Sequence, residues 1–452
     1  MTAAMTASDR RLAVGLFALI TIAAFEATAV ITALPTITDE LGGDALYGAT
    51  VAANLLANIV VIVAAADAAD RHGPGRPFVV CAALFIVGLG VAGAAHSMLV
   101  VVGGRVLQGA GVGGFAAIVY VAVRRGIPAE RQPVTYAWMS AGWVLPSLLA
   151  PALAGWVTES IGWRWVFLGI IPLVLLAGLV VAPPLLALAP SPAAIPRGHG
   201  RLADAARAAS GLAAVLVGLA QARLVVLLPL VVAGAAVSVP ALRRLFPAGV
   251  TRARRGLPAV VACRLCATMA FLGVDSFLPL AADRLHGVGP IAQGMLIIGA
   301  ALTWTAGQAT SARLHSRVAP GRLVRIGFVV LATGAVAASI VVNPDIPLIV
   351  VFFAWSIGGF GMGLLFNPTT VTAMSSAEPG EEGLVGSQMN MADSLGFAVM
   401  GGLGGAVVAL ADRSALTLQT AIVVNIGMAV AAAGLGFVAA RNVVAQTLVR
   451  AR

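Results

Sequence analysis

The sequence predicts an all-α protein that crosses a membrane many times. Only 10% of its 452 residues are charged and 60% are hydrophobic, whereas about a quarter of the residues of a soluble domain are charged. Apolar runs of about 20 residues recur from Leu12 to Val438, and each is long enough to cross a hydrocarbon core of about 30 Å as a helix. We therefore expect a polytopic helical protein of the lipid bilayer.

We predict fourteen spans, with twelve as the alternative. They begin near Leu12, Ala45, Pro77, Met98, Val134, Trp165, Ala208, Leu224, Leu257, Pro290, Leu323, Pro347, Ser387 and Ala415. The seventh is short. It and the eighth therefore form either a hairpin that crosses the membrane, which gives fourteen spans, or a segment that does not cross, which gives twelve. The first run follows two arginines, but it is too long for a signal peptide and lacks a clear cleavage site, which favours an uncleaved first helix.

The arginines predict the sidedness. The basic residues are all arginines, and the net charge is +10. Alternate gaps between spans hold most of them, whereas the other gaps hold only Arg164, Arg223, Arg284 and Arg413. Loops rich in arginine stay in the cytoplasm, so we expect both termini to be cytoplasmic, in a bacterial plasma membrane. This distribution also explains the net positive charge, so we expect no nucleic-acid partner.

The spans divide into two halves. We predict a six-helix half at residues 1–188, a linker with a two-helix hairpin at 189–256, and a second six-helix half at 257–452. The linker begins with turn-forming residues, namely Pro190, Pro192, Pro196, Gly198 and Gly200. Two repeated halves with a binding site near the middle of the membrane are typical of transporters.

Four local motifs follow one another in the expected spans. The loop after the second span reads Asp70-Arg71-His72-Gly73-Pro74-Gly75-Arg76, the fourth span contains Arg105-Val106-Leu107-Gln108-Gly109, the fifth contains Ala150-Pro151 to Gly155, and Gly162-Trp163-Arg164 opens the sixth. Together they resemble the major facilitator superfamily, and most closely its drug–proton antiporter branches of the fourteen-helix type. The resemblance covers essentially the whole chain. It implies a gating role for Asp70, Arg71, Gly73 and Arg76.

The motifs also depart from the family pattern. In the loop, Ala66 and Ala68 replace the usual Gly and Leu, and Pro74-Gly75 interrupt the basic run. In the fifth span, Ala150 and Ala154 replace glycines, which weakens the argument for export. A purely structural role for Asp70, through Arg71 or Arg76, is the alternative to gating.

Two pairs of ionisable residues have matching depths within their spans. Glu26 is about 21 Å from the inner end of the first span and Arg105 about 10 Å from the outer end of the fourth, so they meet in a core of about 30 Å. Ionisable groups inside a membrane are functional by default, and we expect Glu26 and Arg105 to couple transport to protons; a fixed structural pair is the alternative. Arg264 and Asp393 both lie roughly 10 Å deep, so they form either a structural ion pair or a functional one in which Asp393 contributes to proton coupling.

Other polar and aromatic residues are candidates for the substrate site. Asp275, nearer the outer end of its span, either binds a proton or substrate or reaches external water. The candidate substrate-binding residues are Asn54, Asn58, Gln108, Trp138, Trp304 and Asn390. Hydrogen bonds between helices and interfacial packing are the alternative roles for these side chains.

The sequence predicts a secondary transporter and not an enzyme. It has no nucleotide-binding Gly-rich loop with Lys, and Cys263, Cys266 and the five histidines suggest neither a metal site nor a cofactor. We expect a proton-coupled exporter of small amphipathic or drug-like compounds. A proton symporter for a nutrient and a non-transporting sensor or assembly partner are the alternatives. Substrate identity, proton stoichiometry and oligomeric state do not follow from the sequence.

Overall fold

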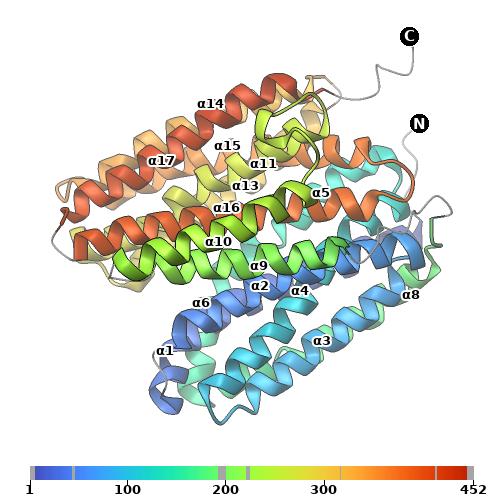
Figure 1. Ribbon diagram of the computed structural model, residues 1–452, viewed down its shortest axis with the longest axis horizontal. Coiled ribbons are helices and arrows are strands. Elements are labelled where there is room, and N and C mark those ends of the chain that lie inside the picture. Colours follow the sequence, from blue (N-terminus) through green and yellow to red (C-terminus); the bar gives the residue numbers. More distant parts are fainter. Residues whose placement is uncertain are drawn as a thin grey trace. The chain divides into compact units, whose positions relative to one another are not determined.

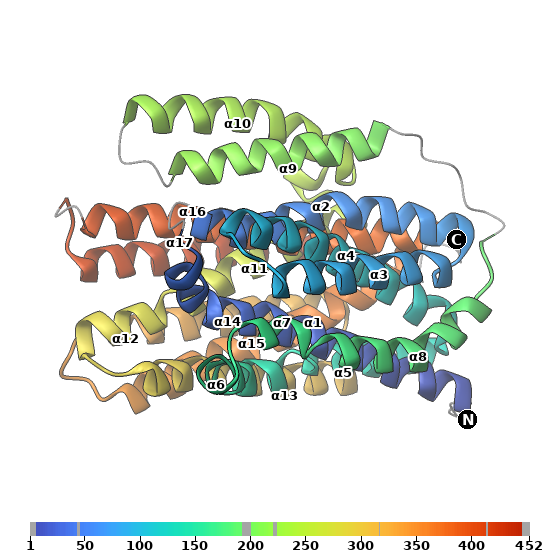
Figure 2. The same ribbon diagram turned by 90° about the horizontal axis from the view of Figure 1, so that it is seen from below.

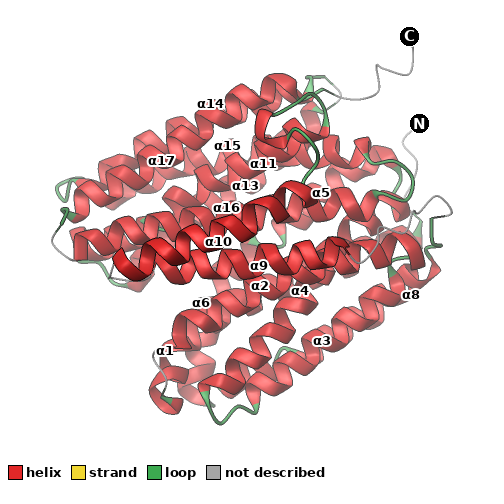
Figure 3. Ribbon diagram, in the orientation of Figure 1, coloured by secondary structure: helices red, strands yellow, loops and turns green. Residues whose placement is uncertain are grey.

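The computed structural model describes residues 6–42, 46–191, 200–219, 224–315, 317–412 and 415–444. Within these ranges the chain consists of helices and loops and has no strand (Figure 3), which confirms the predicted all-α class. Part of the predicted linker, residues 192–199, lies outside the described residues, as do Arg223 and Arg413.

The helices are numbered in Figure 1. The first eight are α1 (Ala7–Leu41), α2 (Tyr47–His72), α3 (Gly75–Gly93), α4 (Met98–Gly126), α5 (Gln132–Ala141), α6 (Val144–Ser160), α7 (Arg164–Leu168) and α8 (Ile171–Ala187). They are followed by α9 (Gly200–Leu219), α10 (Leu224–Leu245), α11 (Leu257–Asp275), α12 (Leu278–His286), α13 (Pro290–Leu314), α14 (Pro320–Ala338), α15 (Leu348–Ser376), α16 (Glu382–Asp412) and α17 (Leu418–Ala439).

Twelve helical segments in the described part of the chain are long and apolar enough to cross a membrane. The number equals the lower of the two predicted counts, and fourteen spans stay a prediction. The twelve include both hairpin helices, α9 and α10. They do not include residues 132–160, because a turn at Gly142 and Trp143 divides this run into α5 and α6. They also do not include α13, which carries the polar residues Gln293, Thr303 and Gln308.

The chain forms two compact units. Unit 1 comprises Met1–Ala213 and Ala377–Asn390, and unit 2 comprises Ala214–Ser376 and Met391–Arg452. In unit 1, α4 packs against α2 and α3, and α1 packs against α6 and α8 (Figure 2). In unit 2, α15 packs against α13 and α14, and α11 packs against α17. Unit 1 thus holds the first turns of α16, and unit 2 holds the remainder of that helix.

Glycines set the close approach of the helices around α4. A Cβ atom on Gly104 would lie 2.8 Å from Ala92 of α3, and one on Gly88 of α3 would lie 2.7 Å from the backbone of Gln108. A Cβ on Gly109 would overlap the backbone of Asn54 in α2. Small residues let membrane helices approach one another closely, so these glycines place α4 directly against its two neighbours.

This packing predicts a sharp difference between two adjacent glycines. Gly104→Val inserts a branched side chain where α3 leaves no space, and overpacking of this kind costs about 1–3 kcal/mol. Gly103→Val is the matched control, because a Cβ on Gly103 meets no atom within 4 Å. Thermal unfolding in detergent should show a lower melting temperature for Gly104→Val only. Equal melting temperatures would contradict the close α3–α4 contact.

Candidate coupling and substrate sites

The structure brings Glu26 of α1 and Arg105 of α4 together in the interior of unit 1. Their exposed fractions are 1% and 4%, and Arg105 Nη1 donates to Glu26 Oε1. Gln108 lies one turn after Arg105 on the same face of α4, and its Oε1 accepts from the same Nη1 at 2.6 Å. Gln108 Nε2 in turn donates to the Gly88 carbonyl of α3 at 3.2 Å. The pair therefore belongs to a polar chain that joins α1, α4 and α3.

This ion pair is incompletely satisfied. Glu26 Oε2 and Arg105 Nε are buried and have no hydrogen-bond partner among the described residues. A carboxylate in water accepts at both oxygens, and a buried polar atom without a partner costs about 1–3 kcal/mol. Oε2 of Glu26 is therefore open to a proton, a water molecule or a donor group of a ligand.

Asp70, at the end of α2, is the centre of a second cluster in unit 1. It is 1% exposed, and its Oδ1 accepts from Arg125 Nη2 at 3.1 Å and from the Gly383 amide at 2.9 Å. Its Oδ2 accepts from the Leu384 amide at 3.3 Å. Gly383 and Leu384 lie in the first turn of α16, where helix amides lack partners within the helix and the dipole favours an anion. Asp70 thus caps the N-terminus of α16, and its partner Gly383 lies 313 residues away in the sequence.

The other residues of the predicted gating loop have different surroundings. Arg71 pairs with Asp67 one turn earlier in α2, and Arg76 is exposed. Gly73 has φ = 79°, and a Cβ there would lie 2.7 Å from the Leu188 carbonyl. A left-handed conformation and a close carbonyl together require glycine at this position.

Two members of the Asp70 cluster, Arg125 and Glu382, were not among the sequence candidates. Arg125 Nη2 also donates to Glu382 Oε2 at 2.7 Å, and this carboxylate accepts from the Gly380 amide at 3.0 Å. A signal was present in the sequence, because one gap predicted to be cytoplasmic holds Glu378, Glu381 and Glu382 and no arginine. The compensating arginine lies on α4, too distant in sequence for a pattern to reveal it.

Arg264 of α11 and Asp393 of α16 meet in unit 2, with Arg264 Nε 2.7 Å from Asp393 Oδ1. The same oxygen accepts from the Thr268 hydroxyl at 2.8 Å. Arg264 Nη1 donates to the Thr370 hydroxyl at 3.0 Å, and the guanidinium carbon lies 3.1 Å from the Phe366 ring centroid. The arginine is 1% exposed, and its partners come from two helices, α15 and α16. This number of contacts is typical of a structural anchor.

Asp275 of α11 borders an aromatic cluster in the same unit. Its Oδ1 accepts from Trp355 Nε1 at 2.8 Å. The Phe271 ring lies 5.1 Å from that of Trp355 and 5.0 Å from that of Trp304, whose ring lies 5.2 Å from Phe366. Trp304 Nε1 is buried and has no hydrogen-bond partner among the described residues. Aromatic rings beside a carboxylate are suited to an apolar cation.

The remaining candidates are dispersed. Asn54 Nδ2 is buried and lacks a hydrogen-bond partner in the described part of the chain, and Asn58 and Asn390 are partly buried. Trp138 is 63% exposed and meets the Phe17 ring edge-on at 6.1 Å, which fits an interfacial residue better than a cavity wall. Gln308 of α13 was not a candidate, yet its side-chain amide is fully buried with neither polar atom bonded to a described residue.

Residues 16–401 match the sequence profile of the Major Facilitator Superfamily. The chain belongs to this superfamily. Its resemblance to the family, drawn above from four motifs, is thereby confirmed. A relative from Mycobacterium tuberculosis, named "Probable multidrug-efflux transporter", is 27% identical over 402 residues, which are 84% of this chain and 83% of the relative. The MFS-type efflux pump LUC4 of a Fusarium species is 34% identical over 163 residues, 35% of this chain and 29% of the pump.

Solved structures of the superfamily have the same fold. The human organic anion transporter MFSD10 superposes with a TM-score of 0.69 at 15% identity, covering 95% of this chain and 99% of that one. The proton:xylose symporter XylE superposes with a TM-score of 0.66 at 13% identity, covering 94% of each chain. This major facilitator protein is therefore an integral membrane transporter of small molecules.

The Asp70 cluster leads to a prediction about turnover. Asp70→Asn should reduce the transport rate about tenfold with little change in substrate affinity, because losing a charge-assisted hydrogen bond costs about 1.5–3 kcal/mol. Arg125→Gln should be at least as severe, since it leaves two acceptors without their cation. The double variant should fall short of the summed effects, as expected for residues in contact.

Arg71→Gln is the matched control, because Arg71 belongs to an exposed pair with Asp67. Initial transport rates and substrate binding are measured on the same purified, monodisperse samples. Wild-type turnover in folded Asp70→Asn, or an equal loss in Arg71→Gln, would contradict a specific role for this cluster.

Proposed function

We propose that this transporter exports small amphipathic compounds in exchange for protons by alternating access. The observation that carries the proposal is the Glu26–Arg105 pair: a buried carboxylate with one oxygen bonded to Arg105 and the other without a partner among the described residues. Burying an ionisable group of this kind inside a membrane protein costs free energy. A role in proton transfer explains why such a group is present. Energy input is adequate, since moving one charge through 100 mV supplies about 2.3 kcal/mol.

The coupling step follows from the contacts of the pair. Protonation at Oε2 neutralises Glu26 and removes most of its attraction for Arg105. Gln108 Oε1 still accepts from Arg105 at 2.6 Å, so the guanidinium keeps one partner while the ion pair between α1 and α4 is weakened. Proton binding thereby changes the relative stability of two arrangements of these helices, as a ligand does when it prefers one conformation.

Unit 2 supplies the proposed substrate site. Asp275 and Trp304 are partly exposed: Asp275 provides a negative charge, and Trp304 provides a ring face and an indole N–H without a partner among the described residues. Phe271 and Trp355 are buried and contact these two side chains. A lipophilic cation satisfies both features, since it gains cation–π contacts and neutralises the carboxylate. Asp393 is assigned the structural role, because Arg264 and Thr268 already occupy its Oδ1.

The proposed direction of transport is outward, and the proposed orientation has both termini in the cytoplasm of a bacterium. Relatives named as efflux proteins support the direction, and the arginine-rich alternate loops support the orientation. In this orientation the Asp70 cluster lies at the cytoplasmic ends of its helices, where it is placed to hold one conformation until the substrate or proton changes the balance. In nutrient symport the substrate and the protons move in the same direction, whereas in export by exchange they move in opposite directions. The direction of substrate movement relative to the protons therefore separates the two functions.

Glu26→Gln keeps the shape of the side chain but cannot release a proton. In liposomes with an imposed pH gradient, this variant should lose substrate movement driven by the gradient while retaining substrate binding. Glu40→Gln in the same helix is the matched control, because Glu40 is half-exposed and pairs with Arg164. Full gradient-driven flux in folded Glu26→Gln would exclude Glu26 as the required carrier. Uptake in the direction of the protons, instead of exchange, would replace export with symport.

Asp275→Asn should weaken the binding of cationic substrates at least about tenfold, equivalent to about 1.4 kcal/mol, and should affect neutral analogues much less. Asp283→Asn in α12 is the control, since Asp283 is exposed and accepts only from Gln293 among the bonds found for its side chain. Binding is measured with a fluorescent lipophilic cation and its uncharged analogue. An equal loss for both ligands would make Asp275 a structural residue.

A further inference from the structure

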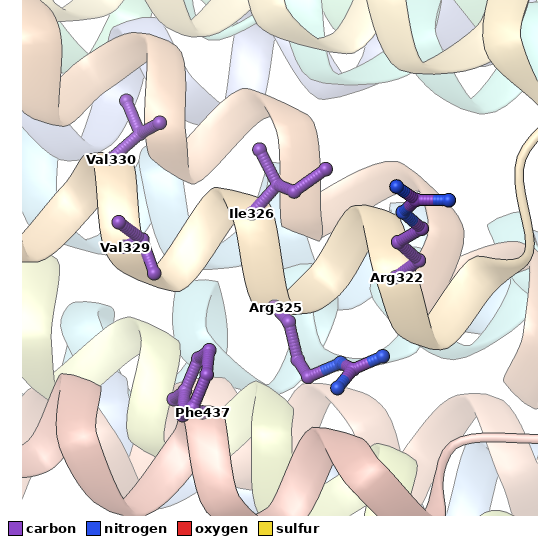
Figure 4. A pocket seen from close by; sticks show the side chains of 6 residues that line it. All are labelled: Arg322, Arg325, Ile326, Val329, Val330 and Phe437. Atoms are coloured by element: carbon purple, nitrogen blue, oxygen red, sulfur yellow. The ribbon is translucent and has the colours of Figure 1, made fainter.

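A groove of about 340 Å³ lies on unit 2 between α14 and α17, away from the candidate sites described above. It is lined by Arg322, Arg325, Ile326, Val329, Val330 and Phe437 (Figure 4). Five of these residues belong to α14, and Phe437 belongs to α17. The groove therefore combines two cations with four apolar side chains.

The apolar part of the groove faces outward on two helices long enough to cross a membrane. Ile326 is 44% exposed and Val329 is 53% exposed, and both α14 and α17 are among the twelve candidate spans. In a bilayer these side chains contact acyl chains. Figure 4 shows Val329 and Phe437 on the facing sides of the two helices, so a chain lying between them contacts both.

The basic part lies within the first two turns of α14. Arg322 and Arg325 are three residues apart, about one turn of the helix, and both line the groove. Neither forms an ion pair with a described carboxylate, and Arg325 Nε is buried without a hydrogen-bond partner in the described ranges. Two guanidinium groups without a described carboxylate partner, near the positive end of a helix dipole, attract an anion, and their N–H groups match the geometry of a phosphate.

We propose that this groove binds one anionic phospholipid, with its phosphate between Arg322 and Arg325 and an acyl chain along Ile326, Val329 and Phe437. Charge complementarity selects the headgroup, because basic pockets between membrane helices bind anionic lipids. The exposed apolar side chains select a lipid over free phosphate, which satisfies only the two arginines. The site is independent of the proposed transport mechanism.

The test is native mass spectrometry of the full chain in detergent, titrated with phosphatidylglycerol and phosphatidylcholine that have identical acyl chains. Each arginine near a membrane surface contributes about 1 kcal/mol to the binding of acidic lipid. The wild type should therefore prefer phosphatidylglycerol at one site by about 30-fold, which equals about 2 kcal/mol. The Arg322→Gln/Arg325→Gln variant should lose this preference, and Arg325→Lys should retain part of it.

Arg10→Gln/Arg11→Gln is the matched control, because it removes the same charge from two exposed arginines of α1. It should retain the wild-type preference. Equal affinity of the wild type for both lipids, or an equal loss in the control, would overturn the proposal. Displacement of the lipid by millimolar inorganic phosphate would also overturn it, because the site would then recognise free phosphate. Size-exclusion profiles and melting temperatures identify variants that have unfolded.

Discussion

An uncompensated charge is expensive in the apolar interior of a membrane protein, and this cost organises the structure. In each ion-pair cluster described above, an opposite charge or hydrogen-bonding groups lower this cost. Glu26 is paired with Arg105, Asp70 with Arg125 and the first amides of α16, and Arg264 with Asp393, two threonines and an aromatic face. These links join helices that are distant in sequence, so the same contacts that satisfy the charges also define the packing.

The three clusters differ in how completely their atoms are satisfied, and this difference separates structure from function. Arg264 has partners on two other helices, α15 and α16, and Asp70 accepts at both oxygens. Such groups are stable in one arrangement and costly to rearrange. Glu26 and Arg105 each retain an atom without a described partner, so their arrangement is closer in energy to an alternative. In the proposed mechanism, this group responds to a single proton.

Close helix packing allows the paired side chains to reach one another. Gly88, Gly104 and Gly109 let α4 approach α2 and α3, which brings Arg105 and Gln108 within reach of α1 and α3. The same principle operates in unit 2, where a Cβ on Gly363 would overlap α13 near Trp304. The outer faces follow different rules: they are apolar where they meet acyl chains, and Arg322 and Arg325 form no ion pair with a described carboxylate.

The sequence by itself determined the fold class and gave an expected depth for each ionisable residue, because apolar run length and helical rise are local properties. The matching expected depths made Glu26 with Arg105 and Arg264 with Asp393 candidate pairs. Tertiary structure decided what depth cannot specify: which face of a helix meets which neighbour. Only the packed helices reveal Arg125 and Glu382 as partners around Asp70, Trp355 as the donor to Asp275, and the division of residues 132–160 into two helices. The direction in which a side chain points around its helix, and the identity of the neighbouring helix, depend on contacts between distant segments. No local sequence pattern encodes them.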